Sequence, residues 1–81
     1  MTNKIAVITI LTGNAAFCED SGEETQAASG AEQARILRAL ADEIEAGGVF
    51  YRALRDINGN VVGHYEYVAR ERVTLKIESL D

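Results

Sequence analysis

The ionisable residues of this chain are most concentrated in an acidic segment of its N-terminal half. Five carboxylates and no lysine or arginine lie between positions 19 and 32, namely Glu19, Asp20, Glu23, Glu24 and Glu32. The other eight acidic residues are matched by eight basic ones, so this segment accounts for the whole net charge of −5. Such a field can steer a basic partner or imitate the phosphates of a nucleic acid, and it can equally be a solvated loop.

Residues that could carry out catalysis are isolated from one another in the sequence. Cys18 and His64 are the only cysteine and histidine, and no Cys-His signature joins them. A lone histidine in a strand is more typical of a surface or cross-strand contact. Asp56 and Asn60 flank a segment that lacks the spacing of a calcium loop, so we expect them to bond turn backbone groups. The sequence predicts no enzyme, no metal and no cofactor.

The bulk composition predicts one small domain over residues 1–81. A chain of 81 residues cannot supply two separate cores, and 47% apolar residues are enough for one. A single cysteine favours a reducing compartment, and no stretch has the length of a membrane span, so a cytoplasmic protein is expected. An acidic chain is a poor ligand for phosphate, so direct nucleic-acid binding is not expected.

The first half of the chain predicts a strand, a loop and the start of a helix. An apolar, β-branched run predicts a strand over residues 4–12 that is covered on both faces. Phe17 follows in a short apolar island and is expected to pack into the core. The acidic and small residues of 18–29 predict a mobile surface loop. Ser29 and Glu32 have the spacing of a capping box, which predicts that a helix begins near residue 30.

The predicted helix covers residues 30–46 and ends at Gly47-Gly48. Its apolar residues repeat at intervals of three and four positions and predict one buried stripe, made of Ala34, Leu37, Leu40, Ala41 and Ile44. The pattern therefore predicts a helix with one face against a sheet.

Two further strands, residues 49–57 and 60–69, flank Asn58-Gly59, a strong signal for a two-residue hairpin turn. Alternation then predicts a face toward the helix, made of Phe50, Leu54, Gly63, Tyr65 and Tyr67. The opposite face is expected to carry Tyr51, Arg55, Val62, His64 and Glu66. A last strand is predicted over residues 72–79.

These elements predict an α+β fold of order β-α-β-β-β, with one helix packed on an antiparallel sheet of about four strands. The first strand is expected beside either the last strand or the second. Of Tyr51, Tyr65 and Tyr67, two are expected to fill the core. The alternative is that exposed tyrosines, together with Arg55, anchor an interface.

Three blocks of the sequence resemble a group of short, uncharacterised phage and prophage proteins: Thr12-Gly13-Asn14-Ala15-Ala16-Phe17, Ala34-Arg35-Ile36-Leu37-Arg38-Ala39-Leu40-Ala41 and Leu54-Arg55-Asp56-Ile57-Asn58-Gly59-Asn60-Val61-Val62-Gly63. The resemblance extends from the first strand to Gly63. It implies a mobile-element setting and no particular activity. Small acidic proteins in that setting often occupy a host protein's surface, and anti-CRISPR proteins are the class we compare by analogy of setting, not of sequence.

We therefore expect a non-enzymatic protein that binds a basic surface of a host protein, possible targets being the positively charged channels of CRISPR effectors. The residues expected to make this contact are Glu19, Asp20, Glu23 and Glu24. The alternative is a structural module that forms a homodimer through a sheet edge or through the face that carries Tyr51 and Arg55.

Overall fold

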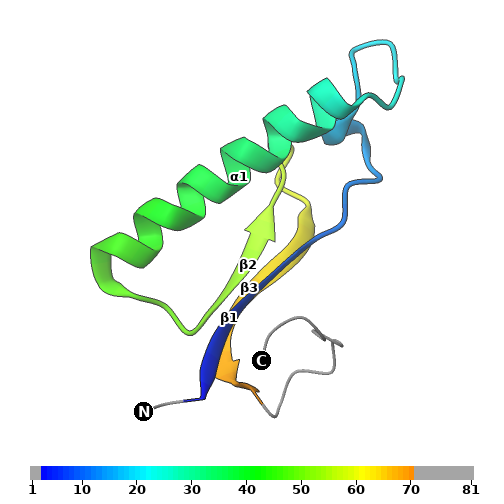
Figure 1. The fold of residues 1–81 in the computed structure, drawn as a ribbon. Helices are drawn as coiled ribbons and strands as arrows, with labels where there is room; N and C mark the ends of the chain where they lie inside the picture. The colour runs from blue at the N-terminus through cyan, green and yellow to red at the C-terminus, as the bar shows by residue number, and fades with distance from the viewer. Residues whose placement is uncertain (1–2, 71–81) are drawn as a thin grey trace.

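A computed structural model describes residues 3–70 and has an α+β fold (Figure 1). In chain order the elements are β1 (Lys4–Ile10), η1 (Ala15–Phe17), α1 (Gln26–Gly47), β2 (Tyr51–Arg55) and β3 (Val61–Ala69). The predicted fold class is confirmed as one helix and a three-stranded antiparallel sheet within the described residues. The predicted strand 72–79 lies outside them.

The strands follow the order β1-β3-β2, so β3 is central and pairs antiparallel with both neighbours. β1 lies along β3 from the pair Lys4 and Ala69 to the pair Ile10 and Gly63. β1 and β2 are therefore parallel to each other, with β3 between them and α1 as the crossover, which is a split β-α-β unit. The first strand is therefore not beside the second, and its predicted place beside the last strand, 72–79, lies outside the described residues.

α1 begins four residues earlier than predicted. Thr25, not Ser29, is the N-cap, and its hydroxyl accepts the backbone N–H of Ala28 at 3.1 Å. Ser29 lies inside the helix, where its hydroxyl accepts from the Gln33 side chain. The C-terminal end is as predicted, because Gly48 has a φ of +70° and its N–H bonds the Ile44 carbonyl at 2.8 Å.

The buried stripe of α1 is rotated from the predicted one. Ile36 and Leu40 are 3% exposed, whereas Leu37, predicted to be buried, is 39% exposed. The buried positions follow an i, i+4 row that runs from Glu32 through Ile36 and Leu40 to the half-buried Ile44. The prediction for Leu37 was wrong because apolar residues occupy adjacent positions here, and the sequence pattern alone does not say which row faces the sheet.

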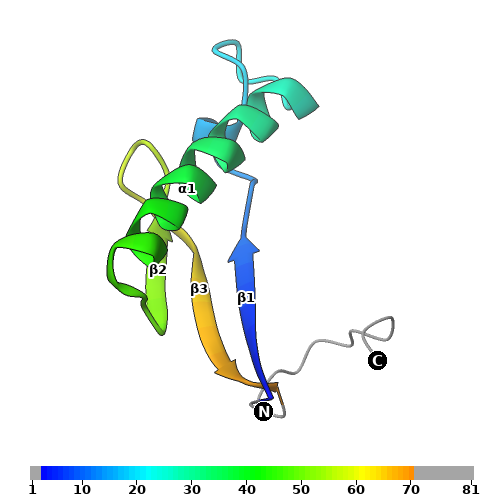
Figure 2. The same cartoon turned by 60° about the vertical axis from the view of Figure 1, so that its left-hand side comes forward.

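The core lies between α1 and one face of the sheet. Figures 1 and 2 show from two sides how α1 crosses that face. Phe17 is 1% exposed and packs into this core as predicted. Its other buried members are Ile36, Leu40, Leu54, Val62 and Tyr65.

The predicted hairpin is present, but its turn is longer than two residues. Asp56 N–H bonds the Asn60 carbonyl, and Gly59 N–H bonds the Asp56 carbonyl, each at 2.9 Å. This pattern closes a three-residue loop with Gly59 at a φ of +88°, where glycine avoids the strain of a side chain. A register shift follows at Leu54 and Arg55, and it turns Val62 into the core instead of onto the opposite face.

β1 is an edge strand of the described sheet, and the prediction that both its faces are covered is wrong for these residues. Burial alternates along β1, and Ile8 is exposed despite the apolar run. The described sheet places α1 on one face, so a continuous apolar sequence here does not mean burial on two faces.

Candidate interaction surfaces

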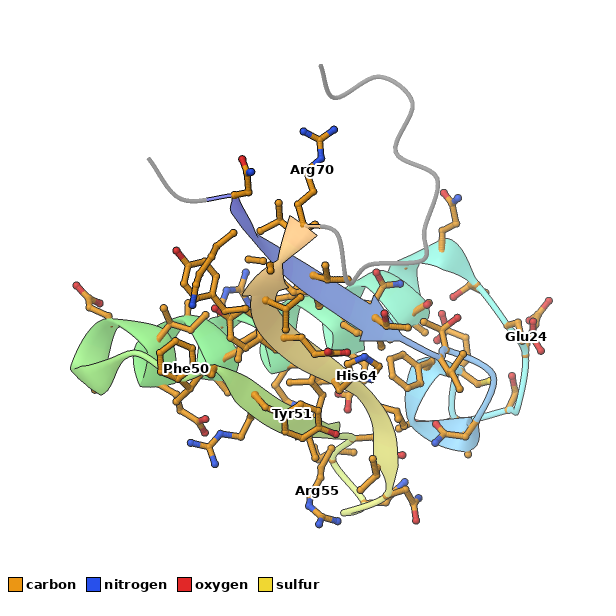
Figure 3. All side chains as sticks on the ribbon, turned by 90° about the horizontal axis from the view of Figure 1, so that it is seen from below. Glu24, Phe50, Tyr51, Arg55, His64 and Arg70 are labelled. Atoms are coloured by element: carbon orange, nitrogen blue, oxygen red, sulfur yellow. The ribbon has the colours of Figure 1, made fainter. Side chains whose placement is uncertain are left out.

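The acidic turn, residues 19–24, is a closed turn rather than an open loop. Glu19 N–H bonds the Glu23 carbonyl at 2.8 Å, and Gly22 N–H bonds the Glu19 carbonyl at 2.7 Å. Gly22 has a φ of +89°, so the turn repeats the hydrogen-bond pattern of the hairpin turn. Asp20, Glu23 and Glu24 are exposed, and Figure 3 shows Glu24 at the outer end of the ribbon.

Thr25 ties the acidic turn to α1. Besides capping the helix, its hydroxyl donates to a Glu19 carboxylate oxygen at 2.6 Å. The side chains of Asp20, Glu23 and Glu24 make no hydrogen bond or ion pair to the part of the chain that the structure describes. These three are therefore available to a partner, while Glu19 also has a structural role.

Residues 26–29, predicted to belong to the loop, form the first turn of α1. Glu32 is buried in the same helix, so the acidic surface includes neither these four residues nor Glu32. No lysine or arginine occurs from residue 5 to residue 34. The acidic turn therefore forms a negative protrusion beyond the N-terminal end of α1 (Figure 1).

Tyr51 and His64 form a second surface on the sheet face opposite α1. Tyr51 is 60% exposed, and its ring stacks on the His64 ring with 5.9 Å between centroids. His64 Nε2 is 2.7 Å from a carboxylate oxygen of Glu66 on the same strand. Figure 3 shows Tyr51 and His64 on neighbouring strands. The two rings therefore form a stacked pair on this face of the described sheet.

Arg55 ends β2, and its Nη1 donates to the Gly59 carbonyl at 2.9 Å, so it supports the hairpin turn. The acidic turn precedes α1, whereas Tyr51 follows its C-terminal end. A helix of 22 residues is about 33 Å long, so Tyr51 and the acidic turn do not form one site. Arg55 lies at the hairpin turn, apart from both.

A third surface was not predicted. Phe50 and Tyr67, both expected to face the helix, are exposed and stack on each other with 6.2 Å between centroids. Lys4 Nζ lies 5.2 Å from the Phe50 centroid and 5.6 Å from that of Tyr67, within the range of cation–π contacts.

The expectation of two core tyrosines is also wrong, because among the three tyrosines Tyr65 alone is buried. No sequence signal marks this exposure, because it depends on the strand register, which pairs Tyr67 with Ala6 near the end of the sheet.

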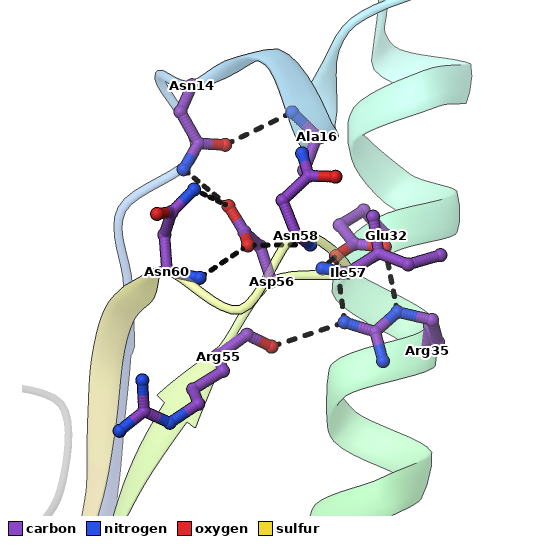
Figure 4. Close-up of polar contacts among 9 residues, drawn as sticks. All are labelled: Asn14, Ala16, Glu32, Arg35, Arg55, Asp56, Ile57, Asn58 and Asn60. Atoms are coloured by element: carbon purple, nitrogen blue, oxygen red, sulfur yellow. Dashed lines mark hydrogen bonds and ion pairs between the residues drawn. The ribbon is translucent and has the colours of Figure 1, made fainter.

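Asp56 organises the junction between the hairpin turn and η1 (Figure 4). It is 4% exposed and accepts the backbone N–H groups of Asn58 and Asn60, each at 2.9 Å, and the Asn14 side-chain amide at 2.7 Å. Burial raises the pKa of the Asp56 carboxyl, but the hydrogen bonds from Asn60, Asn14 and Asn58 outweigh burial and leave this pKa below its ordinary value. The turn-bonding role predicted for Asp56 is confirmed.

Glu32 joins α1 to the same turn. Its carboxylate accepts Arg35 Nε at 2.9 Å and Nη2 at 2.8 Å, and also the Ile57 N–H at 2.8 Å. The hydrogen bond from Arg35 lowers the pKa of Glu32, burial opposes this effect, and the Ile57 bond lowers the pKa further. The hydrogen bond to Glu32 raises the pKa of Arg35. The i, i+3 spacing of Glu32 and Arg35 was the sequence signal for this pair.

No group of three histidine, cysteine, aspartate or glutamate side chains within residues 3–70 is placed to hold a metal ion. None of the helices in that range is both long and apolar enough to cross a membrane. Comparisons with protein family models, with curated proteins and with solved structures find no match to this chain.

Proposed function

We propose that this chain is a non-enzymatic binding protein that docks on a basic surface of another protein through the acidic turn. The observation that carries the proposal is the pair of backbone hydrogen bonds that closes residues 19–23. Because the turn is closed and tied to α1 through Thr25, its carboxylates are presented in one place and less ordering entropy is lost on docking.

The charge distribution supports the same proposal. Three exposed carboxylates without bonded partners stand on a protrusion that has no basic residue near it in sequence. Such a field raises the association rate with a positively charged partner, and the effect weakens as salt rises. The mobile-element setting implied by the sequence resemblance makes CRISPR effector complexes the first partners to test, since they hold nucleic acid in positively charged channels.

The test is a binding and inhibition assay with purified CRISPR effector complexes at several salt concentrations. The variant is Asp20→Lys with Glu24→Lys, which leaves the Glu19 contact to Thr25 intact. The matched control is Asp42→Lys with Glu45→Lys, two exposed positions on α1 that change the net charge equally. We expect the first variant to weaken binding at least about tenfold and the control by less than about threefold.

Equal losses in both variants would mean that net charge, and not the acidic turn, governs binding. Unchanged inhibition by the first variant would leave the turn as a solubilising feature and would reject the proposal.

A second candidate function is self-association through a sheet edge, and β1 favours it. Within the described residues β1 pairs on one side, with β3, and Lys4 is the only charged residue among its seven. Long apolar edges are templates for strand pairing. Sedimentation over a range of protein concentrations tests this candidate. A dimer that dissociates in Ala6→Pro would support it, and a monomer at high micromolar concentration would exclude it.

A further inference from the structure

The groove between α1 and β2 is distinct from the acidic turn. It has a volume of about 290 Å³ and is lined by apolar side chains that include Ile36, Ala39 and Leu54, together with Arg35, Arg52 and Arg55. This volume is at the lower limit of about 300 to 1,000 Å³ for ligand clefts, so it suits a few side chains rather than a large cofactor. Figure 2 shows β2 beside α1, and β3 is the strand that pairs with β2.

β2 presents backbone hydrogen-bonding groups along this groove. Tyr67 N–H donates to the Phe50 carbonyl at 2.8 Å, which fixes the alternation of the antiparallel ladder. The N–H and C=O groups of Tyr51, Ala53 and Arg55 therefore point away from β3. In the described part of the chain no strand lies beyond β2. β2 can thus accept an extended segment as a neighbour.

Arginine side chains make the groove locally basic in an acidic protein. Arg52 Nε is 2.6 Å from a Glu43 carboxylate oxygen, and the Arg52 side chain is 48% exposed. Arg35 is held by Glu32 and donates to the Arg55 carbonyl at 3.2 Å. The charged side chains that line the groove are these three arginines and one carboxylate, Glu43, while Glu32 and Asp56 lie beyond the lining and interact with Arg35. The positive charge of the lining suits a carboxylate ligand, which the guanidinium fork binds with two parallel hydrogen bonds.

We propose that this groove binds an extended acidic peptide segment of a partner protein, which adds to β2 as a strand and places a carboxylate against Arg52. Alternate side chains of a strand point to opposite faces, so every second residue of the peptide enters the groove. The backbone edge supplies affinity, and the arginines supply the preference for acidic residues. This site is opposite in charge to the acidic turn and does not depend on it.

The probe is a short synthetic peptide in which glutamate alternates with valine, and the matched probe has lysine in place of glutamate. Each is titrated into the isotope-labelled full chain while backbone amide resonances are followed. We expect shifts at the Tyr51 and Ala53 amides, and about tenfold tighter binding of the glutamate peptide.

Two variants separate the backbone contribution from the charge contribution. Ala53→Pro removes an N–H that points away from β3, so it should abolish peptide binding while the fold is kept, as circular dichroism would verify. Arg52→Gln should weaken binding of the glutamate peptide by about threefold to tenfold and leave binding of the lysine peptide unchanged. The control is Ala6→Pro on β1, because the Ala6 N–H also points away from β3. This variant should bind the peptide as tightly as the unmodified chain does.

Absence of shifts along β2 with both peptides would overturn the proposal, as would equal affinity for the two peptides. If sedimentation shows a dimer and Ala53→Pro dissociates it, the occupant of the β2 edge is a second copy of this chain, and the proposal of a partner peptide is overturned. The variant Asp20→Lys with Glu24→Lys should bind the glutamate peptide normally, so failure of the groove and failure of the acidic turn are distinguishable.

Discussion

The carboxylate of Glu32 accepts the backbone N–H of Ile57 at 2.8 Å, although the two residues are 25 positions apart. This contact fixes the first half of α1 to the tip of the hairpin. Arg35 holds the same carboxylate through two hydrogen bonds, so the buried charge is paired. The position of the helix over the sheet therefore depends on a polar contact as well as on the apolar core.

Replacement of Glu32 by alanine is expected to destabilise the fold by about 1 to 3 kcal/mol, because it leaves the Ile57 N–H without its acceptor and Arg35 without its carboxylate. Urea unfolding followed by circular dichroism measures the change. The control is Glu45→Ala at an exposed position of α1, with an expected change within about 0.5 kcal/mol. Equal effects of the two substitutions would show that Glu32 contributes no more than a surface residue.

Acid is expected to destabilise the protein through Glu32 and Asp56. Their folded-state pKa values lie below the ordinary carboxyl values of about 4, so the unfolded chain binds these protons more readily. The stabilisation is complete above about pH 4 and is lost as the pH falls through the folded pKa values. Urea midpoints between about pH 7 and pH 2 measure the loss.

Asp56→Asn should be less stable at neutral pH and should lose less stability on acidification than the unmodified chain. A slope on acidification that is unchanged by Asp56→Asn would contradict the role assigned to this carboxyl.

The sequence predicted the features of the fold that depend on adjacent residues. Asn58-Gly59 and Gly47-Gly48 mark the hairpin and the end of α1, because positive φ values are a local requirement. The helix start was not predictable in this way. Ser29 and Glu32 have capping-box spacing, yet Glu32 is engaged by Ile57 from a distant segment, and Thr25 provides the cap.

The local irregularity next to the turn was also beyond the sequence. The three-residue loop pairs Arg55 with Val61, and the shift at Leu54 restores the register that a two-residue turn at Asn58-Gly59 would give, with Val62 as the extra, buried residue. Of the candidate site residues, the acidic turn could be identified from charge alone. The groove between α1 and β2 could not, because it depends on which faces of two elements meet.

Thr25→Ala is expected to destabilise the protein by about 1 kcal/mol, since it removes the acceptor of the Ala28 N–H at the helix start. Ser29→Ala is the matched control and should change stability by less than about 0.5 kcal/mol, because Ser29 is inside the helix and alanine has higher helix propensity. Denaturant unfolding compares the two variants. A larger loss in Ser29→Ala would indicate that the helix begins near residue 30.

Gly63→Ala is expected to disrupt the pairing of β1 with β3. A Cβ at this position would clash with the Thr9 carbonyl oxygen, which belongs to the backbone of β1 and cannot rotate away. The expected loss is about 3 kcal/mol or more. Gly30→Ala, in α1 with no atom within 4 Å of the added Cβ, should instead stabilise by about 0.5 to 1 kcal/mol. Similar unfolding midpoints for the two variants would contradict this close approach of the strands.

Hydrogen exchange should distinguish the acidic turn from the hairpin turn, which has the same pattern of backbone bonds. We expect faster exchange at the Gly22 amide than at the Gly59 amide in the free protein. Like charges crowd the acidic turn, whereas the Asp56 carboxylate accepts three hydrogen bonds from Asn58 and Asn60 within the hairpin turn. A basic partner should then slow exchange at Gly22 and leave Gly59 unchanged. Rapid exchange at Gly22 both with and without the partner would place its binding site elsewhere, with the face that carries Tyr51 as the next surface to test.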